Sequence, residues 1–172
     1  MAALPLFPDD PVDAIMQVMA RAFEPQYGEA WNRKQVSDAL SLGTTRHGLI
    51  AHDGGICEAI GGVQRGGSTV GFFLARQILD DAELLLFAVD RASRRRGLGG
   101  RLLDHFCASA SRSGVHRIFL EMRDGNPAVR LYESRGFRRV GTRPAYYRGL
   151  DGTRYDALTF QRILGERISG AI

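Results

Sequence analysis

A basic, glycine-rich stretch at positions 90–100 holds the residues whose types and spacing are best suited to binding an anion. It follows an apolar run at 84–89 and leads into an amphipathic segment from Arg101, which indicates a buried strand, a loop and a helix. Glycines let the backbone approach a ligand closely, and the first N–H groups of a helix lack partners within the helix. The helix dipole attracts negative charge to that end, and arginine donates paired hydrogen bonds to phosphate. The pattern therefore predicts a pyrophosphate-binding loop.

Two other phosphate-binding patterns fit this stretch less well. A Rossmann loop needs a third glycine at the right spacing and an acidic residue about 20 residues later in a βαβ unit, and the stretch has neither. A P-loop needs Gly-Lys-Ser or Gly-Lys-Thr, which does not occur in the chain. A single Gly-x-Gly is a weak signal and an arginine run is commonly a solvated surface, so the prediction depends on residues further along the chain.

Two ionisable side chains stand near the ends of later elements. Glu121 interrupts an otherwise apolar run at 117–122, where the alternative to a functional role is a salt bridge at the strand end with Arg123. Tyr132 lies in a short predicted helix, and its alternative role is a core aromatic whose hydroxyl bonds to the backbone. Neither residue indicates a function by itself, but both follow the loop in a recognisable order.

That order carries a resemblance to a known family. Arg94-x-x-Gly97-x-Gly99 after an apolar strand resembles the pyrophosphate loop of the GCN5-related N-acetyltransferases (GNAT), whose cofactor is acetyl-CoA. The second half of that superfamily's acetyl-CoA site is similar to two further motifs, Leu120-Glu121-Met122-Arg123-x-x-Asn126 and Leu131-Tyr132-Glu133-Ser134-x-Gly136-Phe137.

The resemblance implies a role for each of these residues. Tyr132 would protonate the departing CoA thiolate, and Glu121 would take the proton of the amine directly or through water. Asn126 would contact the cofactor, although its spacing to Tyr132 is one residue shorter than in the family. The peptide N–H groups that would hold the pantetheine arm and thioester are those of Phe87, Ala88 and Val89. The residues that would bind the pyrophosphate are Arg94, Arg95, Arg96, Gly97, Leu98, Gly99 and Gly100.

A narrower resemblance concerns the acceptor. Residues 23–36 are similar to the substrate-side helices of the RimI-type ribosomal-protein alanine N-acetyltransferases, and residues 143–157 resemble their C-terminal hairpin. This implies direct transfer of an acetyl group to the N-terminal α-amine of a protein, in particular an alanine of a ribosomal protein. Trp31, Tyr146 and Tyr147 would bracket the acceptor, although these aromatics could instead pack the hairpin onto the core.

Three alternatives remain open at this point. The same chemistry could act on a small-molecule amine or a lysine side chain. The chain could be an acyl-CoA sensor without catalysis, but a sensor would need neither Glu121 nor Tyr132. The net charge of +4 could reflect nucleic-acid binding. However, the densest basic cluster coincides with the predicted loop and lacks interleaved aromatics, so no direct contact with nucleic acid is expected.

Composition limits the class of protein. At 172 residues, 44% of them hydrophobic, we expect one domain over 1–172 with a core of its own. Cys57 and Cys107 are too few and too far apart for a disulfide framework or a cysteine zinc site, and Cys107 is expected in the core. The four histidines have no metal-ligand spacing, so no metal is expected. Because no signal peptide or membrane-spanning run is recognised, we expect a cytoplasmic protein with no membrane contact.

Local signals along the chain predict alternating helices and strands. Helices are predicted from Asp10-Pro11, from Asn32 to Gly43, from 101 to Ser113-Gly114, and after Asn126-Pro127. Strands are predicted at 48–52, 70–78, 84–89, 117–122, 137–140 or 137–147, and 155–161, with an irregular connection at 54–68 that could hold a short strand at 59–63. The predicted class is α/β, a single-domain GNAT-like fold whose mixed central sheet has helices on both faces.

Overall fold

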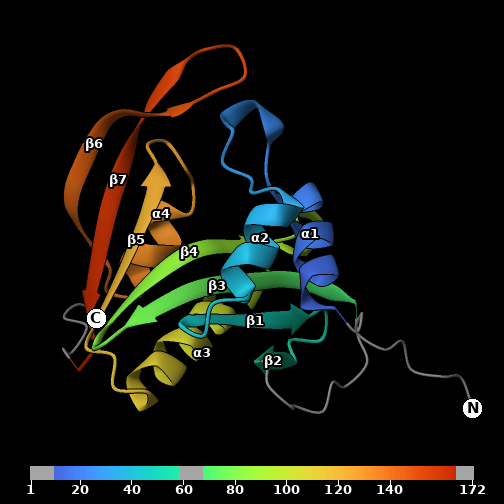
Figure 1. The fold of residues 1–172 in the computed structure, drawn as a ribbon, viewed down its shortest axis with the longest axis vertical. Helices are drawn as coiled ribbons and strands as arrows, with labels where there is room; N and C mark the ends of the chain where they lie inside the picture. The colour runs from blue at the N-terminus through green and yellow to red at the C-terminus, as the bar shows by residue number, and fades with distance from the viewer. Residues whose placement is uncertain (1–9, 59–67, 166–172) are drawn as a thin grey trace, which may run out of the picture.

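A computed structural model describes residues 10–58 and 68–165 and is built on one seven-stranded sheet. The strands lie in the order β2-β1-β3-β4-β5-β7-β6 (Figure 1). Neighbouring strands are antiparallel except β4 and β5, which are parallel, so the predicted mixed sheet is confirmed. The strand bounds are β1 Thr45–Ala51, β2 Ile56–Glu58, β3 Thr69–Ile78, β4 Asp81–Val89, β5 Arg117–Arg123, β6 Arg138–Arg148 and β7 Arg154–Ile163.

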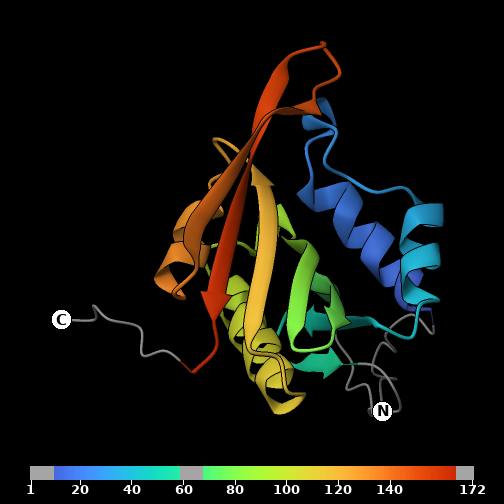
Figure 2. The same ribbon diagram turned by 60° about the vertical axis from the view of Figure 1, so that its left-hand side comes forward.

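Helices cover both faces of this sheet, as predicted (Figure 1 and Figure 2). Helices α1 and α2 pack with one face of β1, β3 and β4, and helices α3 and α4 pack on the other face. Among the described residues, no helix is both long and apolar enough to cross a membrane. The helix bounds are α1 Pro11–Ala22, η1 Pro25–Tyr27, α2 Arg33–Leu40, η2 Arg91–Ser93, α3 Leu98–Arg112 and α4 Val129–Ser134.

The two N-terminal helices begin at the caps that the sequence predicts. The Asp10 side chain accepts a hydrogen bond from the Val12 N–H at 2.8 Å, with Pro11 in the first turn. Asn32 and Gln35 form a reciprocal capping box at the start of α2. Helix α2 ends at Leu40 rather than running to Gly43. These local caps place both helices before any packing is considered.

Strand β4 contains a bulge that changes which face its side chains occupy. Leu86 pairs with Leu74 of β3 and Leu84 pairs with Ala75, so Leu85 is an extra residue. In a regular strand without a bulge, Leu84 and Leu86 would share a face, because every second side chain points to the same side. Instead, Leu84 lies in the core under α3, and Leu86 lies in the core under α1.

The bulge also marks the point where β4 leaves β5. The two strands pair from Asp81 opposite Arg117 to Leu84 opposite Leu120 and no further. Beyond this point β5 continues to Arg123 alongside β7, while β4 stays with β3 as far as Val89. The two strands therefore diverge at their carboxyl ends, as Figure 1 shows.

The hairpin of β6 and β7 reaches beyond the rest of the sheet (Figure 2). The sequence left two lengths open for β6, and the structure has the longer one, ending at Arg148. Pro144 is tolerated within β6 because this is an edge strand. The irregular connection contains β2 at its start, whereas the strand considered at 59–63 lies outside the described residues.

Candidate active site

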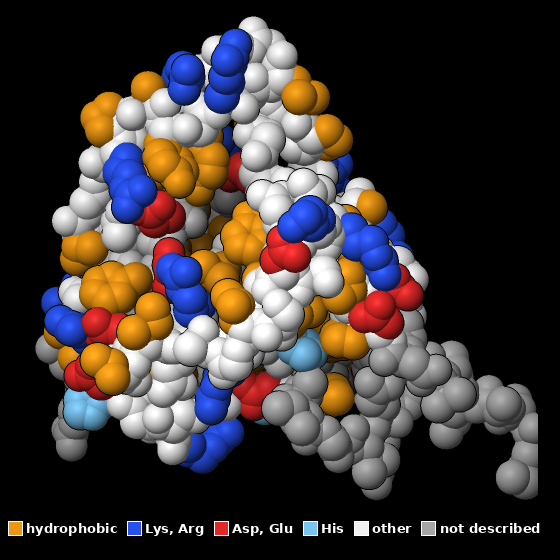
Figure 3. Space-filling model, viewed as in Figure 1, with side chains coloured by type: hydrophobic (Ala, Val, Ile, Leu, Met, Phe, Trp, Pro, Cys, Tyr) orange, Lys and Arg blue, Asp and Glu red, His pale blue; other side chains and the backbone are white. Residues whose placement is uncertain are grey.

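A cavity of about 480 Å³ lies where β4 and β5 diverge. It brings together the strand end, the glycine loop and the short helix α4, which are far apart in the sequence. In the space-filling view, hydrophobic side chains gather in a hollow in the middle of one face, with charged groups at its rim (Figure 3). The residues predicted from the sequence that line the cavity are Phe87, Ala88, Val89, Arg94, Arg95, Gly97, Gly99, Gly100, Asn126 and Tyr132. Arg96 and Leu98, predicted with them, are not among the lining residues.

The glycine loop presents unpaired backbone donors at this cavity. The first hydrogen bond within α3 runs from the Arg101 N–H to the Gly97 carbonyl, 3.0 Å, which leaves the N–H groups of Leu98, Gly99 and Gly100 without intrahelical partners. Gly97 caps the helix at a φ of 77°, a left-handed conformation that glycine adopts without strain. This geometry suits an anion, as the sequence predicts.

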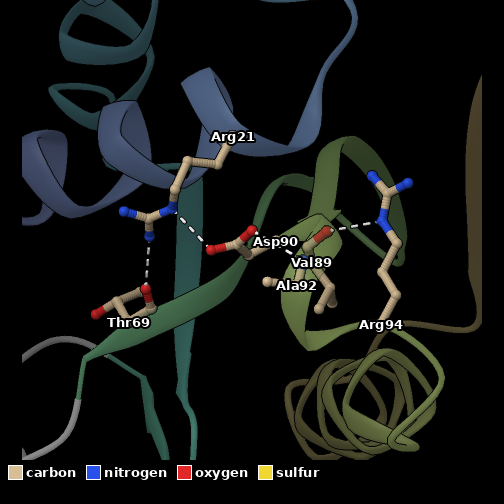
Figure 4. A network of polar contacts seen from close by, with 6 residues as sticks. All are labelled: Arg21, Thr69, Val89, Asp90, Ala92 and Arg94. Carbon is tan, nitrogen blue, oxygen red and sulfur yellow. Dashed lines mark hydrogen bonds and ion pairs between the residues drawn. The ribbon is translucent and has the colours of Figure 1, made fainter.

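Arg94 lines the cavity, and its guanidinium also bonds to two backbone carbonyls. Its Nε donates to the Val89 carbonyl at 3.0 Å, and its terminal nitrogen donates to the Ala22 carbonyl at 2.8 Å. Beside it, Arg21 pairs with Asp90 at 2.7 Å and donates to the Thr69 carbonyl at 3.1 Å (Figure 4). The Arg94 guanidinium therefore holds the end of α1 against the end of β4, at the wall of the cavity.

The other loop arginines differ in their surroundings. Arg95 lines the cavity and has a φ of 60°, so the backbone turns sharply at this residue. Arg91 pairs with Glu24 at 3.4 Å. Arg96 contacts His52 on the turn between β1 and β2. Arg95 is therefore the loop arginine whose side chain is best placed for a ligand in the cavity.

Tyr132 is buried in the wall of the same cavity. Its ring packs edge-on against Phe87, with ring centroids 6.1 Å apart, and against Phe137, at 5.7 Å. Burial raises the pKa of its hydroxyl above the ordinary value, so the proton stays on at neutral pH. No hydrogen bond joins the hydroxyl to another described residue, so the backbone bond considered from the sequence is not present.

Glu121 lies on β5 beside a second hollow, of about 560 Å³. Its side chain is 22% exposed, and its Oε1 lies 3.1 Å from the Nε of Arg143 on β6. The Thr159 hydroxyl donates to the same oxygen at 3.3 Å. The salt bridge considered with Arg123 is not formed; Arg143 takes that place because it lies across the β6–β7 ladder from β5. The structure thus places Glu121 and Tyr132 along different hollows.

Three further residues in the cavity wall were given no site role from the sequence. Tyr27, Glu29 and Arg123 line the cavity that contains Tyr132. The Arg123 guanidinium lies 3.6 Å from the ring centroid of Tyr27 and 5.3 Å from that of Tyr155 on β7. Glu29 sits in a loop without periodicity and has no motif around it. The sequence offered no signal for it beyond its position inside the segment that resembles the substrate-side helices.

The aromatic residues proposed for the acceptor are separated in space. Tyr146 and Tyr147 pack edge-on at the hairpin, 5.2 Å between ring centroids, and Tyr146 is exposed. Burial, with the charges of Glu29 and Glu121, raises the pKa of Tyr147 to about 12. Trp31 packs instead against the core beside α1 and lines neither hollow. Tyr146 and Tyr147 also line neither hollow, although Tyr147 lies near Glu29 and Glu121 and Tyr146 contacts Arg143. Trp31 belongs to the packing that supports the site.

Cys107 is buried in α3, as expected, and burial raises the pKa of its thiol to about 11. It therefore remains a protonated core residue rather than a nucleophile. Within the two described ranges, no group of three or more His, Cys, Asp and Glu is placed to hold a metal ion.

The cavity fits an acyl-CoA ligand in its chemistry. One end has the free N–H groups of α3 for a pyrophosphate, with Arg95 beside them. Next to it runs the edge of β4 beyond Leu84, which β5 does not pair and which can bond to the amides of a pantetheine arm. The Tyr132 side chain also lines this cavity.

Comparison with known proteins agrees with this geometry. A family model described as "Acetyltransferase (GNAT) family" matches residues 14–137. The [ribosomal protein bS18]-alanine N-acetyltransferase of Escherichia coli K12 is 40% identical over 93 residues, which cover 54% of this chain and 62% of that protein. The N-alpha-acetyltransferase RimI of Mycobacterium tuberculosis is 38% identical over 121 residues, 70% of this chain and 68% of that protein. The match thus spans less than two thirds of the Escherichia coli relative's length.

Solved structures resemble the whole fold. The crystal structure of the ribosomal-protein-S18-alanine N-acetyltransferase from Escherichia coli has a TM-score of 0.73 and 25% identity, covering 100% of this chain and 99% of that one. The structure of Ard1 from Thermoplasma volcanium has a TM-score of 0.68 and 26% identity, covering 95% and 98%.

Proposed function

The chain belongs to the acetyltransferase (GNAT) family, and from that premise we propose that it acetylates the N-terminal α-amine of a protein, using acetyl-CoA. The observation that carries this proposal is one cavity that combines a free helix N-terminus, an unpaired strand edge and a buried tyrosine. An acyl-CoA binder needs the first two features, whereas the tyrosine serves a departing thiolate.

Several residues would hold the cofactor. The N–H groups of the first turn of α3 would bind the pyrophosphate, with the Arg95 side chain adding charge. Arg94 would act indirectly, by holding the loop to α1. The strand edge at 87–89 would bind the pantetheine arm, and Asn126 would border it from the turn before α4.

The bound cofactor would supply the acetyl group as an activated thioester. Tyr132 would donate its proton to the departing sulfur, since burial keeps that proton on the hydroxyl. Glu121 would accept the proton of the amine through water, because it lies along the neighbouring hollow rather than in the cavity itself. Arg143 would have to move aside from Glu121 for this role, and its exposed position leaves it room to do so.

The acceptor is proposed from the relatives and from the chemistry of the amine. Two matched relatives are named as an alanine N-acetyltransferase of ribosomal protein bS18 and as an N-alpha-acetyltransferase. An α-amine has a pKa of about 7.7–8.0, against about 10.4 for lysine, so far more of it is neutral at pH 7. A single carboxylate such as Glu121 would then suffice as the base. A ribosomal-protein acceptor would place the reaction in the cytoplasm.

The test is a pair of peptides with the same sequence, starting with alanine. One peptide has a free α-amine; the other has a blocked α-amine and an internal lysine. We expect acetylation of the first peptide, with a rate that rises as pH passes through the α-amine pKa of about 8. Equal or faster acetylation of the blocked peptide would overturn the N-terminal assignment. A small-molecule acceptor would be indicated if neither peptide were acetylated while a panel of amines was.

A further inference from the structure

Glu29 is a carboxylate in the cavity that none of the roles above uses. It lies in the segment between η1 and α2, and its side chain is 14% exposed. Together with Tyr132 it lines the cavity where β4 and β5 diverge. Its Oε1 lies 3.6 Å from the Nε of Arg123 at the end of β5. Glu29 is thus a carboxylate in the wall of the same cavity as Tyr132, the residue proposed to protonate the departing thiolate.

Arg123 does not fully satisfy this carboxylate. The guanidinium is held between the rings of Tyr27 and Tyr155, and its side chain is only 8% exposed. The distance of 3.6 Å from Glu29 is longer than a hydrogen bond. Among the described residues, the Arg123 Nε has no hydrogen-bond partner. The guanidinium instead contacts the two tyrosine rings and donates a hydrogen bond to the Asp124 carbonyl at 2.9 Å.

The electrostatics of the pocket agree with an incomplete pair. Burial raises the pKa of Glu29 above its ordinary value, and the opposing charge of Arg123 does not offset this rise. The negative charges of Glu29 and Glu121 both add to the rise in the pKa of Tyr147, after burial. A carboxylate in this condition is stabilised by a second cation that donates hydrogen bonds to it.

We propose that Glu29 binds the α-ammonium group of the acceptor's N-terminus and positions its nitrogen beside the thioester. The inference rests on the proposed function and adds the residue that recognises the free N-terminus. At neutral pH most α-amines arrive as ammonium ions, which carry a positive charge and several N–H donors. A chain whose N-terminus is already blocked offers neither. The bound ammonium group would then pass one proton through water to Glu121, as described above, which leaves a neutral amine to attack the thioester.

Two unreactive peptides test this contact directly. Both share the sequence of the alanine-starting substrate. One starts with N,N-dimethylalanine, which keeps a positive charge and one N–H donor. The other has a propionyl group in place of alanine, which keeps the carbon skeleton without the nitrogen. Each is used as a competitive inhibitor of substrate acetylation by the wild type, by Glu29→Gln and by the control Glu133→Gln. Glu133 is an exposed carboxylate on α4.

We expect the wild type and Glu133→Gln to prefer the dimethylated inhibitor by about tenfold or more, the scale of one hydrogen bond to a charged group. Glu29→Gln should lose that preference. For the reactive peptide, Glu29→Gln should raise KM about tenfold with little change in kcat or in acetyl-CoA affinity. Glu29→Asp, which keeps the charge on a shorter side chain, should recover part of the preference and serves if Glu29→Gln does not fold.

An unchanged preference in Glu29→Gln would overturn the proposal, as would the absence of a preference in the wild type. A purely structural role would lower the melting temperature and kcat of Glu29→Gln but keep the preference for the charged inhibitor. If the wild type acetylated no peptide amine at all, the proposed function would fail first. If the wild type acetylated the peptide but bound the two inhibitors equally well, only the role of Glu29 would fail.

Discussion

At the scale of single residues, burial sets the properties of Tyr132. The ring packs against Phe87 and Phe137, and the buried hydroxyl is in surroundings that disfavour the charged phenolate. Burial therefore raises the pKa of Tyr132, and the tyrosine stays protonated across the pH range in which an α-amine becomes neutral. A proton donor and a neutral nucleophile can then coexist at the same pH.

The first residue-scale prediction is the substitution Tyr132→Phe. It removes one hydroxyl that no described residue bonds, so stability and acetyl-CoA affinity should change little. We expect kcat to fall by roughly 10²-fold, the lower end for the loss of a general acid. Steady-state kinetics with calorimetric binding of acetyl-CoA would measure both quantities. Wild-type turnover in this variant would mean that the tyrosine only packs the core.

At the scale of elements, the site depends on β4 and α3. The extra residue Leu85 moves the end of β4 away from β5, and α3 starts opposite the opening. The two parallel strands therefore end at a gap that a helix N-terminus faces, an arrangement that binds ligands in open α/β sheets. Gly99 belongs to the first turn of α3 and lies close to Val89 on β4 and Leu131 on α4.

The element-scale prediction is the substitution Gly99→Val. An added Cβ would lie 3.5 Å from Leu131 and 3.7 Å from Val89, which are ordinary contacts, so the fold should tolerate it. The two methyl groups beyond it would occupy the approach to the helix N–H groups. We expect acetyl-CoA to bind at least about tenfold more weakly, a loss of about 1.4 kcal/mol.

The matched control for this change is Gly43→Val. A Cβ at Gly43 meets nothing within 4 Å, and the residue lies far from the loop in sequence. Its acetyl-CoA affinity should equal that of the wild type by calorimetry. Equal affinities for Gly99→Val and the wild type would count against the loop as the pyrophosphate site.

At the scale of the whole molecule, one set of polar contacts joins the layer of α1 to the sheet. Arg94 reaches the carbonyls of Ala22 and Val89, while Arg21 reaches Asp90 and the Thr69 carbonyl. The contacts fix the end of α1, the start of β3 and the glycine loop relative to one another. The arginine that begins the loop motif thus has a role in the architecture.

The whole-molecule prediction compares Arg94→Ala with Arg95→Ala. Arg94→Ala leaves two backbone carbonyls without their donors, so the free energy of unfolding should fall by about 1–3 kcal/mol. Arg95→Ala should leave stability within about 0.5 kcal/mol of the wild type, as for most surface changes. It should instead weaken acetyl-CoA binding about tenfold, as expected for one charged hydrogen bond. Chemical denaturation and calorimetry would distinguish the two variants. Equal stability with equally weakened binding would assign both arginines to the ligand.

The sequence by itself determined the family, the order of the elements and most of the cavity wall. The caps at Asp10 and Asn32, the glycine loop before α3 and the apolar run of β4 depend on residues close together in the chain. Such local signals can be recognised without knowing what packs against them. The resemblance to the acetyltransferases is confirmed by the family match, since the motifs occur in the expected order.

Only the tertiary structure decided which residues meet. Sequence spacing could not show that Arg143 rather than Arg123 pairs with Glu121, that Arg94 bonds to the end of α1, or that Glu29 enters the cavity of Tyr132. These contacts join residues 22 to 103 positions apart, as the sequence numbers show. They depend on strand register, and one extra residue, such as Leu85, sends the following side chains to the opposite face of the sheet.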